Sequence, residues 1–194
     1  MLARESKIIV LDFETTGNVK GYLNLPWQIG MVPLRKGKVV ADEAFTSLLR
    51  VPEDHPFNPY TPGRWASRRM EIGKAPSLPE LWPALSARLT HFPLCAHNVG
   101  TERSIITTAF PMQPFNEWID TLPLSRMAFP SLHDHKLQTV LDYLQLNDDL
   151  AHCCPGLQPH DALYDATGAA YIMAFLLNQP GWKNVHLEDL LANR

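Results

Sequence analysis

The most constraining feature of the sequence is a run of aliphatic residues near its start that ends in two carboxylates. Residues 8–11 (Ile-Ile-Val-Leu) are typical of a strand buried on both faces. Asp12 and Glu14 follow two positions apart, so on a strand their side chains point to the same side, and Gly17 then turns the chain. Two buried carboxylates repel each other, which makes a divalent metal ion between them the simplest expectation. A surface turn with solvated acids is the alternative.

Size and composition favour one globular domain over residues 1–194, with 45% hydrophobic and 19% charged residues. No apolar run reaches the roughly 20 residues that span a bilayer, so we expect no membrane association. The first strand begins too early to leave room for a signal peptide, and Cys95, Cys153 and Cys154 lack the spacing of a zinc site or a disulfide framework. We therefore expect a cytoplasmic location. A net charge of −3 means that a nucleic-acid partner would need local basic residues or metals.

The pattern after the first strand predicts an α/β fold with a mixed sheet. It begins with an antiparallel meander, in which a hairpin turn at residues 35–38 joins two further strands. The prolines of residues 51–76 predict irregular structure there, and helices and short strands then alternate. The expected strands are 27–32, 38–49, 93–96 and 118–122, and the expected helices begin at Ser77 and near residue 100 and cover 136–146, 162–178 and 184–193.

A basic and aromatic cluster lies inside the proline-rich segment, where Arg64, Arg68 and Arg69 flank Trp65. Such a cluster either holds a phosphate backbone and stacks on a base, or is a solvated loop with its tryptophan packed on the core. The sequence leaves both interpretations open.

A second carboxylate lies late in the chain, at the start of the last long helix. Asp161 is a good N-cap after Pro159, which places Asp165 about one turn into the helix and His160 in the preceding loop. Both side chains can then reach one site. The small residues 166 and 168–170 favour close packing of this helix on the sheet, toward Asp12 and Glu14. A capping aspartate and a surface histidine would give the same pattern.

Glu102 is a further acid, in the first turn of a helix that follows a buried strand. Ligands of open α/β sheets gather where strands end and helices begin. A first-turn acid is also stabilised by the helix dipole, so Glu102 alone does not decide between a ligand and a structural role.

Taken in order, these motifs resemble those of the DEDDh branch of the DEDD 3′–5′ exonuclease superfamily. They are most similar to the epsilon subunit of bacterial DNA polymerase III and to ribonuclease T. The resemblance covers about residues 7–178 and implies a ribonuclease-H-like fold, with three antiparallel strands followed by parallel strands and flanking helices. Glu102 stands where the family normally has aspartate. The residues that carry the resemblance are 10–17 (Val-Leu-Asp-Phe-Glu-Thr-Thr-Gly), 96–98 (Ala-His-Asn), Glu102, 120–122 (Asp-Thr-Leu), 136–137 (Lys-Leu) and 160–166 (His-Asp-Ala-Leu-Tyr-Asp-Ala).

The resemblance implies hydrolysis of phosphodiester bonds at nucleic-acid 3′ ends, with release of nucleoside 5′-monophosphates and with two Mg²⁺ or Mn²⁺ ions as cofactors. His160 is the implied general base. The implied metal ligands are Asp12, Glu14, Glu102 and Asp165, and the implied substrate contacts are Thr15, Thr16, Gly17, His97 and Asn98.

The expected partner is a single-stranded 3′ end, with DNA favoured. A proofreading role would need a polymerase or another protein partner in trans. Two alternatives stand beside this expectation: an exoribonuclease that trims RNA 3′ ends, and a catalytically weak nucleic-acid-binding scaffold of the same fold.

Overall fold

The computed structural model describes residues 1–115 and 117–192. Six strands within these residues form one mixed sheet, in the order β3-β2-β1-β5-β6, and β4 also pairs with β2. The neighbours β2 and β1 are antiparallel, whereas β5 is parallel to β1 and to β6. This arrangement confirms the predicted mixed sheet of a ribonuclease-H-like fold. The strands are β1 (Lys7–Thr15), β2 (Pro26–Arg35), β3 (Lys38–Val39), β4 (Phe45–Leu48), β5 (Leu94–Ala96) and β6 (Trp118–Asp120).

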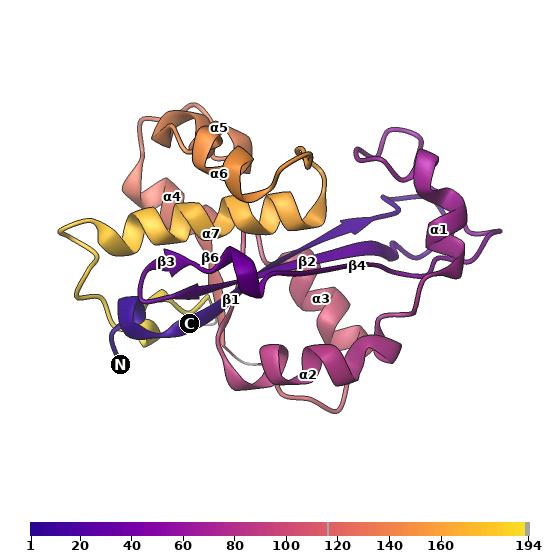
Figure 1. Ribbon diagram of the computed structural model, residues 1–194, viewed down its shortest axis with the longest axis horizontal. Helices are drawn as coiled ribbons and strands as arrows, with labels where there is room; N and C mark the ends of the chain where they lie inside the picture. Colours follow the sequence, from indigo (N-terminus) through magenta and orange to yellow (C-terminus); the bar gives the residue numbers. More distant parts are fainter. Residues whose placement is uncertain (116, 193–194) are drawn as a thin grey trace.

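Helices cover both faces of the sheet (Figure 1). The long helix α7 lies across one face, with α4, α5 and α6 on the same side, and α2 and α3 cover the other face. None of the described helices is long and apolar enough to cross a membrane. The helices are α1 (Arg69–Lys74), α2 (Trp82–His91), α3 (Gly100–Ala109), α4 (Thr121–Ala128), α5 (Leu137–Leu144), α6 (Asn147–Cys153) and α7 (Ala162–Asn178).

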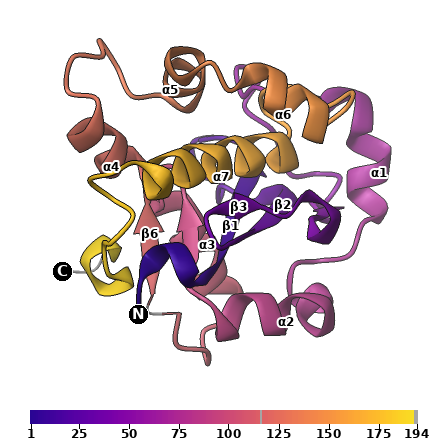
Figure 2. The same cartoon turned by 60° about the vertical axis from the view of Figure 1, so that its left-hand side comes forward.

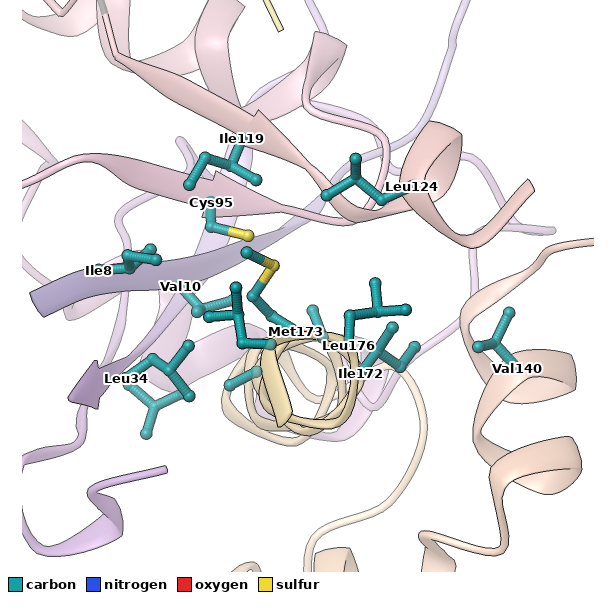
Figure 3. Packing of buried hydrophobic residues seen from close by; sticks show 14 of the residues in the cluster. Ile8, Val10, Leu34, Cys95, Ile119, Leu124, Val140, Ile172, Met173 and Leu176 are labelled. Atoms are coloured by element: carbon teal, nitrogen blue, oxygen red, sulfur yellow. The ribbon is translucent and has the colours of Figure 1, made fainter. Parts of the chain in front are cut away.

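Alternation along β1 divides the core into two layers. Ile8 and Val10 pack on the α7 side, whereas Ile9 and Leu11 pack on the side of α2 and α3. All four side chains are fully buried, as expected for a central strand. Figure 3 shows Met173 of α7 among the strand residues of the first layer.

The predicted third strand, 38–49, is interrupted. The hairpin turn itself is as predicted, with Lys36 and Gly37 both at positive φ. A 3₁₀ turn, Ala41–Glu43, separates β3 from β4. Lys7 and Arg35 both pair with Glu43, at 3.0 and 2.7 Å, which ties this turn to the first two strands.

The proline-rich segment contains a short helix that the sequence reading missed. A 3₁₀ turn (Ala66–Arg68) leads into α1, which lies at the end of the sheet where β1 ends and β2 begins (Figures 1 and 2). The helix forms because Ile72 is fully buried against Trp27 and Val51, in a small third cluster. Residues 64–75 contain no proline, so the helix is not interrupted there.

Three other predicted elements differ from the structure, and two helices were not predicted. The strand expected at 118–122 ends at Asp120, whose side chain accepts a 2.9 Å hydrogen bond from the Leu122 N–H and caps α4. Helices α4 and α6 were not predicted. The helix expected from Ser77 begins as a 3₁₀ turn (Pro79–Leu81) that leads into α2. In place of the terminal helix expected at 184–193 there is a 3₁₀ turn (Leu187–Leu190), and Asn193 lies outside the described residues.

Candidate active site

The two carboxylates of β1 continue the face of the strand that packs on α7. Asp12 and Glu14 are even-numbered like Ile8 and Val10, so they point to the same face of β1, and Ile8 and Val10 belong to the core layer under that helix. The Glu14 side chain is buried in the described structure. The acids therefore lie where this core layer ends, at the carboxyl end of the central strand.

A glycine in the neighbouring strand brings α7 to this point. Gly30 pairs with Asp12 in the β1–β2 ladder. A Cβ atom on Gly30 would overlap the backbone of Ala162 and Leu163, so the start of α7 lies directly on β2. The expected role of the small residues of α7 is only partly right, because Gly168 faces the leucines of α5 and α6.

The close approach of α7 gathers three ionisable side chains. Ligand atoms of Glu14, His160 and Asp165 all lie within 4.8 Å of one another. The backbone N–H of His160 donates a 3.1 Å hydrogen bond to Oδ2 of Asp165. His160 is exposed and has a left-handed backbone, with φ of 67°. The sequence-predicted pair is thus brought together with one acid of β1.

Glu102 supplies a buried carboxylate from the first turn of α3. Its side chain is only 5% exposed, and its Oε2 atom has no hydrogen-bond partner among the described residues. Burial raises the pKa of Glu102 to about 7, and the charge of Asp120 contributes to this rise. An unpaired, buried carboxylate oxygen is unfavourable unless a cation satisfies it.

Asp12 and Glu14 are also affected by the negative charges of the neighbouring acids. Burial, followed by the charges of Glu102, Asp165 and Glu14, raises the pKa of Asp12 well above its usual range. Burial and the neighbouring acids likewise raise the pKa of Glu14 to about 8. The pKa of Asp165 is raised to about 6, again mainly by burial. A hard divalent cation such as Mg²⁺ or Mn²⁺ prefers carboxylate oxygens as ligands, and it would neutralise the repulsion between these buried acids. The residues therefore fit the predicted metal site.

The predicted substrate residue His97 already has two protein partners. Its Nδ1 lies 2.9 Å from Oγ1 of Thr121, and its Nε2 lies 2.8 Å from the backbone oxygen of His135. Burial lowers the pKa of His97. Its neighbour Asn98 is exposed and has φ of 74°, while its N–H donates to Asp120 at 2.8 Å. The ring of His97 thus ties two loops together, whereas the Asn98 side chain faces solvent.

The loop after β1 is fastened to the proline-rich segment. Thr16 is fully buried, and its Oγ1 accepts a 3.0 Å hydrogen bond from the Leu25 N–H. Its carbonyl oxygen accepts another, at 2.8 Å, from the N–H of Asn58. A Cβ atom on Gly17 would overlap the Thr61 side chain. Thr15 is half-buried and lies just before this loop. The three predicted substrate residues therefore lie where the loop after β1 packs against the proline-rich segment.

The arginines of the proline-rich segment have protein partners. Arg69 donates to the carbonyl oxygens of Pro52, Glu53 and His55 at 2.7–3.1 Å. Arg68 pairs with Glu71, and Trp65 stacks on Phe57 at 4.6 Å. These contacts favour the structural interpretation of the cluster over a phosphate-binding one.

Asp120 is a residue whose importance at the site the sequence reading missed. Its carboxylate accepts hydrogen bonds from the N–H groups of Asn98, Val99 and Leu122, at 2.8, 3.2 and 2.9 Å. It therefore fixes the turn that leads to Glu102. The signal in the sequence is an aspartate between a short apolar strand and a threonine, which is typical of an N-cap.

Comparison with known families supports what this geometry indicates. A family model named RNase_T and described as exonuclease matches residues 9–173. The chain belongs to this family of exonucleases. This membership confirms the prediction that the protein is an exonuclease, and therefore an enzyme.

Among curated relatives, the exonuclease is similar to two long bacterial proteins. It is 24% identical over 200 residues to the PolC-type DNA polymerase III of Bacillus cereus, with 98% of this chain aligned. It is 25% identical over 190 residues to the corresponding protein of Oceanobacillus iheyensis, with 95% of this chain aligned. The chain spans only 13% and 12% of the length of these two relatives.

Solved structures share the fold. Exonuclease X, determined in complex with 5′-overhanging duplex DNA, aligns with a TM-score of 0.67 and 24% identity, over 94% of this chain and 98% of its own. The nuclease domain of 3′hExo, a DEDDh family member bound to rAMP, aligns with a TM-score of 0.72 and 17% identity, over 95% and 98% of the two chains. These matches confirm the ribonuclease-H-like architecture.

Proposed function

We propose that residues 1–194 act as one exonuclease domain that removes nucleotides from single-stranded DNA 3′ ends and releases nucleoside 5′-monophosphates. The observation that carries this proposal is the gathering of Glu14, His160 and Asp165 at the end of β1, where their ligand atoms lie within 4.8 Å of one another. The charge of Glu102 acts on both Asp12 and Glu14, so these acids lie near the same place. The similarity to PolC-type DNA polymerases supports DNA as the substrate. It also supports a role beside a polymerase.

The acids of the site are suited to hold two divalent cations, Mg²⁺ or Mn²⁺. Asp12 lies on the central strand, close enough to Glu102, Asp165 and Glu14 for their charges to raise its pKa, so it would be one of the ligands of these ions. Glu14, Glu102 and Asp165 would complete the ligand set. Such a pair of ions supplies charge neutralisation of the phosphate and a lowered pKa of bound water.

His160 is suited to take the proton from the attacking water. Partial desolvation of the imidazole lowers its pKa, which favours the neutral ring that can accept a proton near neutral pH. A ring nitrogen lies within 4.8 Å of carboxylate oxygens of Glu14 and Asp165, and His160 is exposed to solvent. This position beside Glu14 and Asp165 supports the proposal that His160 is the general base.

The loop after β1 is suited to bind the terminal nucleotide. Thr15 and Gly17 lead away from Glu14 and are partly exposed, whereas Thr16 is fully buried and fastens the loop to the proline-rich segment. Asn98 offers an exposed amide at the start of α3. For His97 we propose a contact through the face or edge of the ring, because both nitrogens have protein partners.

Digestion of matched oligonucleotides tests the proposal. Purified protein with Mn²⁺ should shorten 5′-labelled single-stranded DNA stepwise from its 3′ end. RNA and duplex substrates of the same sequence test the alternative of RNA trimming, which the rAMP complex of the similar nuclease 3′hExo favours.

Two histidine variants provide the control. His160→Ala should lower kcat about 100- to 10,000-fold, the range typical of a lost general base. It should leave Mn²⁺ binding by calorimetry intact. His152→Ala, which changes an exposed histidine of α6, should behave as the wild type. Intact DNA and RNA after long incubation, together with no Mn²⁺ binding, would instead favour the scaffold alternative.

A further inference from the structure

Asp161, the residue between His160 and α7, has more partners than a helix cap requires. Its side chain is 5% exposed. Oδ1 accepts hydrogen bonds from Nε2 of Gln28 at 3.1 Å and from the N–H of Leu163 at 3.3 Å, and Oδ2 pairs with Nη2 of Arg64 at 3.1 Å. The bond to Leu163 is sufficient to cap α7. The other two therefore need a separate explanation.

Gln28 ties the start of α7 to the strand beside the metal ligands. It is 4% exposed and pairs with Glu14 in the β1–β2 ladder. While its Nε2 donates to Asp161, its Oε1 accepts from the Ala162 N–H at 3.3 Å. One side chain thus fixes both a side chain and a backbone group at the point where the helix begins.

Arg64 reaches the same point from the proline-rich segment. Its side chain is 44% exposed, yet its guanidinium pairs with the buried carboxylate of Asp161. The adjacent Gly63 has φ of 95°, and a Cβ atom there would lie 3.1 Å from the carbonyl oxygen of His160 and 3.7 Å from Oε2 of Glu14. The segment therefore lies on the peptide of His160 itself.

The backbone of His160 needs such support. Its φ of 67° is in the left-handed region, which a residue with a Cβ atom rarely adopts. A strained conformation of this kind persists only where its surroundings fix it. The fixed groups around it are the Asp165 carboxylate, which accepts from the His160 N–H, and the Asp161 network on the following residue.

We propose that Arg64 is a positioning residue, which acts through Asp161 and together with Gln28 to hold His160 over Glu14 and Asp165. The proposal rests on the proposed function, because it takes His160 to be the general base. Arg64 acts on the geometry of the base and makes no contact with the substrate. The sharp expectation is a lower kcat at unchanged KM when Arg64 is truncated.

A double-mutant cycle tests this assignment on single-stranded DNA. Arg64→Ala should lower kcat about 10- to 100-fold, as expected for a base displaced by a fraction of an ångström to 1 Å, with KM unchanged. In the His160→Ala background, the same truncation should have no further effect, because the base it positions is absent. Arg64→Lys should recover most of the activity, since a single N–H group of Arg64 bonds to Asp161.

Arg68→Ala is the matched control, because it removes a positive charge from the same segment but its partner is Glu71. It should keep wild-type kcat and KM. A salt-dependent rise of KM in both arginine variants would show that the segment binds the substrate strand, and would overturn the proposal. Additive losses in the Arg64/His160 double variant would overturn it too. Full activity of His160→Ala alone would overturn the proposed function, and this inference with it.

Discussion

Replacing Glu14 by glutamine should stabilise the metal-free protein above neutral pH, although it removes a proposed ligand. In the folded protein, burial and neighbouring acids raise the pKa of Glu14 from 4.5 to about 8. A carboxyl group with a raised pKa resists ionisation in the fold but ionises freely in the unfolded chain. It therefore leaves stability unaffected below pH 4.5 and destabilises the fold progressively as the pH rises toward 8.

The magnitude follows from these two pKa values. Linkage predicts that Glu14 destabilises the metal-free fold by about 1 kcal/mol at pH 5 and by about 4 kcal/mol at pH 8. The neutral amide of Glu14→Gln lacks this dependence. The difference in unfolding free energy between variant and wild type should therefore change by about 3 kcal/mol over this interval, in favour of the variant at pH 8.

Urea denaturation in EDTA at pH 5 and pH 8 measures this difference. Glu5→Gln, which changes an exposed glutamate of the N-terminal 3₁₀ turn (Ala3–Glu5), should follow the wild type at both values. Adding Mn²⁺ at pH 8 should stabilise the wild type more than Glu14→Gln, because binding to the folded state adds stability and the variant lacks a ligand. The reasoning is refuted if Glu14→Gln and wild type respond identically to pH in EDTA.

Two further predictions concern the elements that build the site. Gly30→Ala should destabilise the protein by about 3 kcal/mol or more in urea denaturation, because the new methyl group would overlap the backbone at the start of α7; Gly100→Ala, which meets open space, should be neutral or stabilising, and equal effects of the two would contradict this account. Asp120→Ala should destabilise by about 2 kcal/mol, because three N–H groups lose their acceptor, and retention of wild-type stability would show that water replaces the carboxylate.

The elements that the sequence predicted well carry strong local signals. The limits of α7, Ala162–Asn178, agree with the prediction, because Asp161 caps its start and its composition is mostly apolar. The central strand β1 was recognised from its uninterrupted aliphatic run. Both elements are buried, so the pattern of apolar residues and the final structure report the same constraint.

The elements that were missed depend on contacts distant in sequence. Helix α1 forms because Ile72 packs on Trp27 and Val51, and the 3₁₀ turn after β3 is held by two cations that pair with Glu43. Neither interaction is visible in the local pattern. The prolines of residues 51–76 therefore led to the prediction of a loop, and residues 38–49 were predicted as one continuous strand.

The candidate site shows the same division between local and distant information. Every acid of the family motif was identified from the sequence, but the network around Asp161 was not, since Gln28 and Arg64 lie 133 and 97 residues away from it. Their residue types are unremarkable in their own segments. Gln28 and Arg64 become partners of Asp161 only because α7 packs on β2.

The way in which the acids meet depends on Gly30 more than on the small residues of α7. The sequence reading attributed the close approach to that helix, yet Gly168 faces Leu141 and Leu150 on the far side. A glycine in the middle of a buried strand is unfavourable by itself, and it is explained when another backbone must pass close by. Gly30 lies opposite Asp12 in the sheet. Because Gly30 has no side chain, the start of α7 can pack on β2 at this point and so reach the carboxylates of β1.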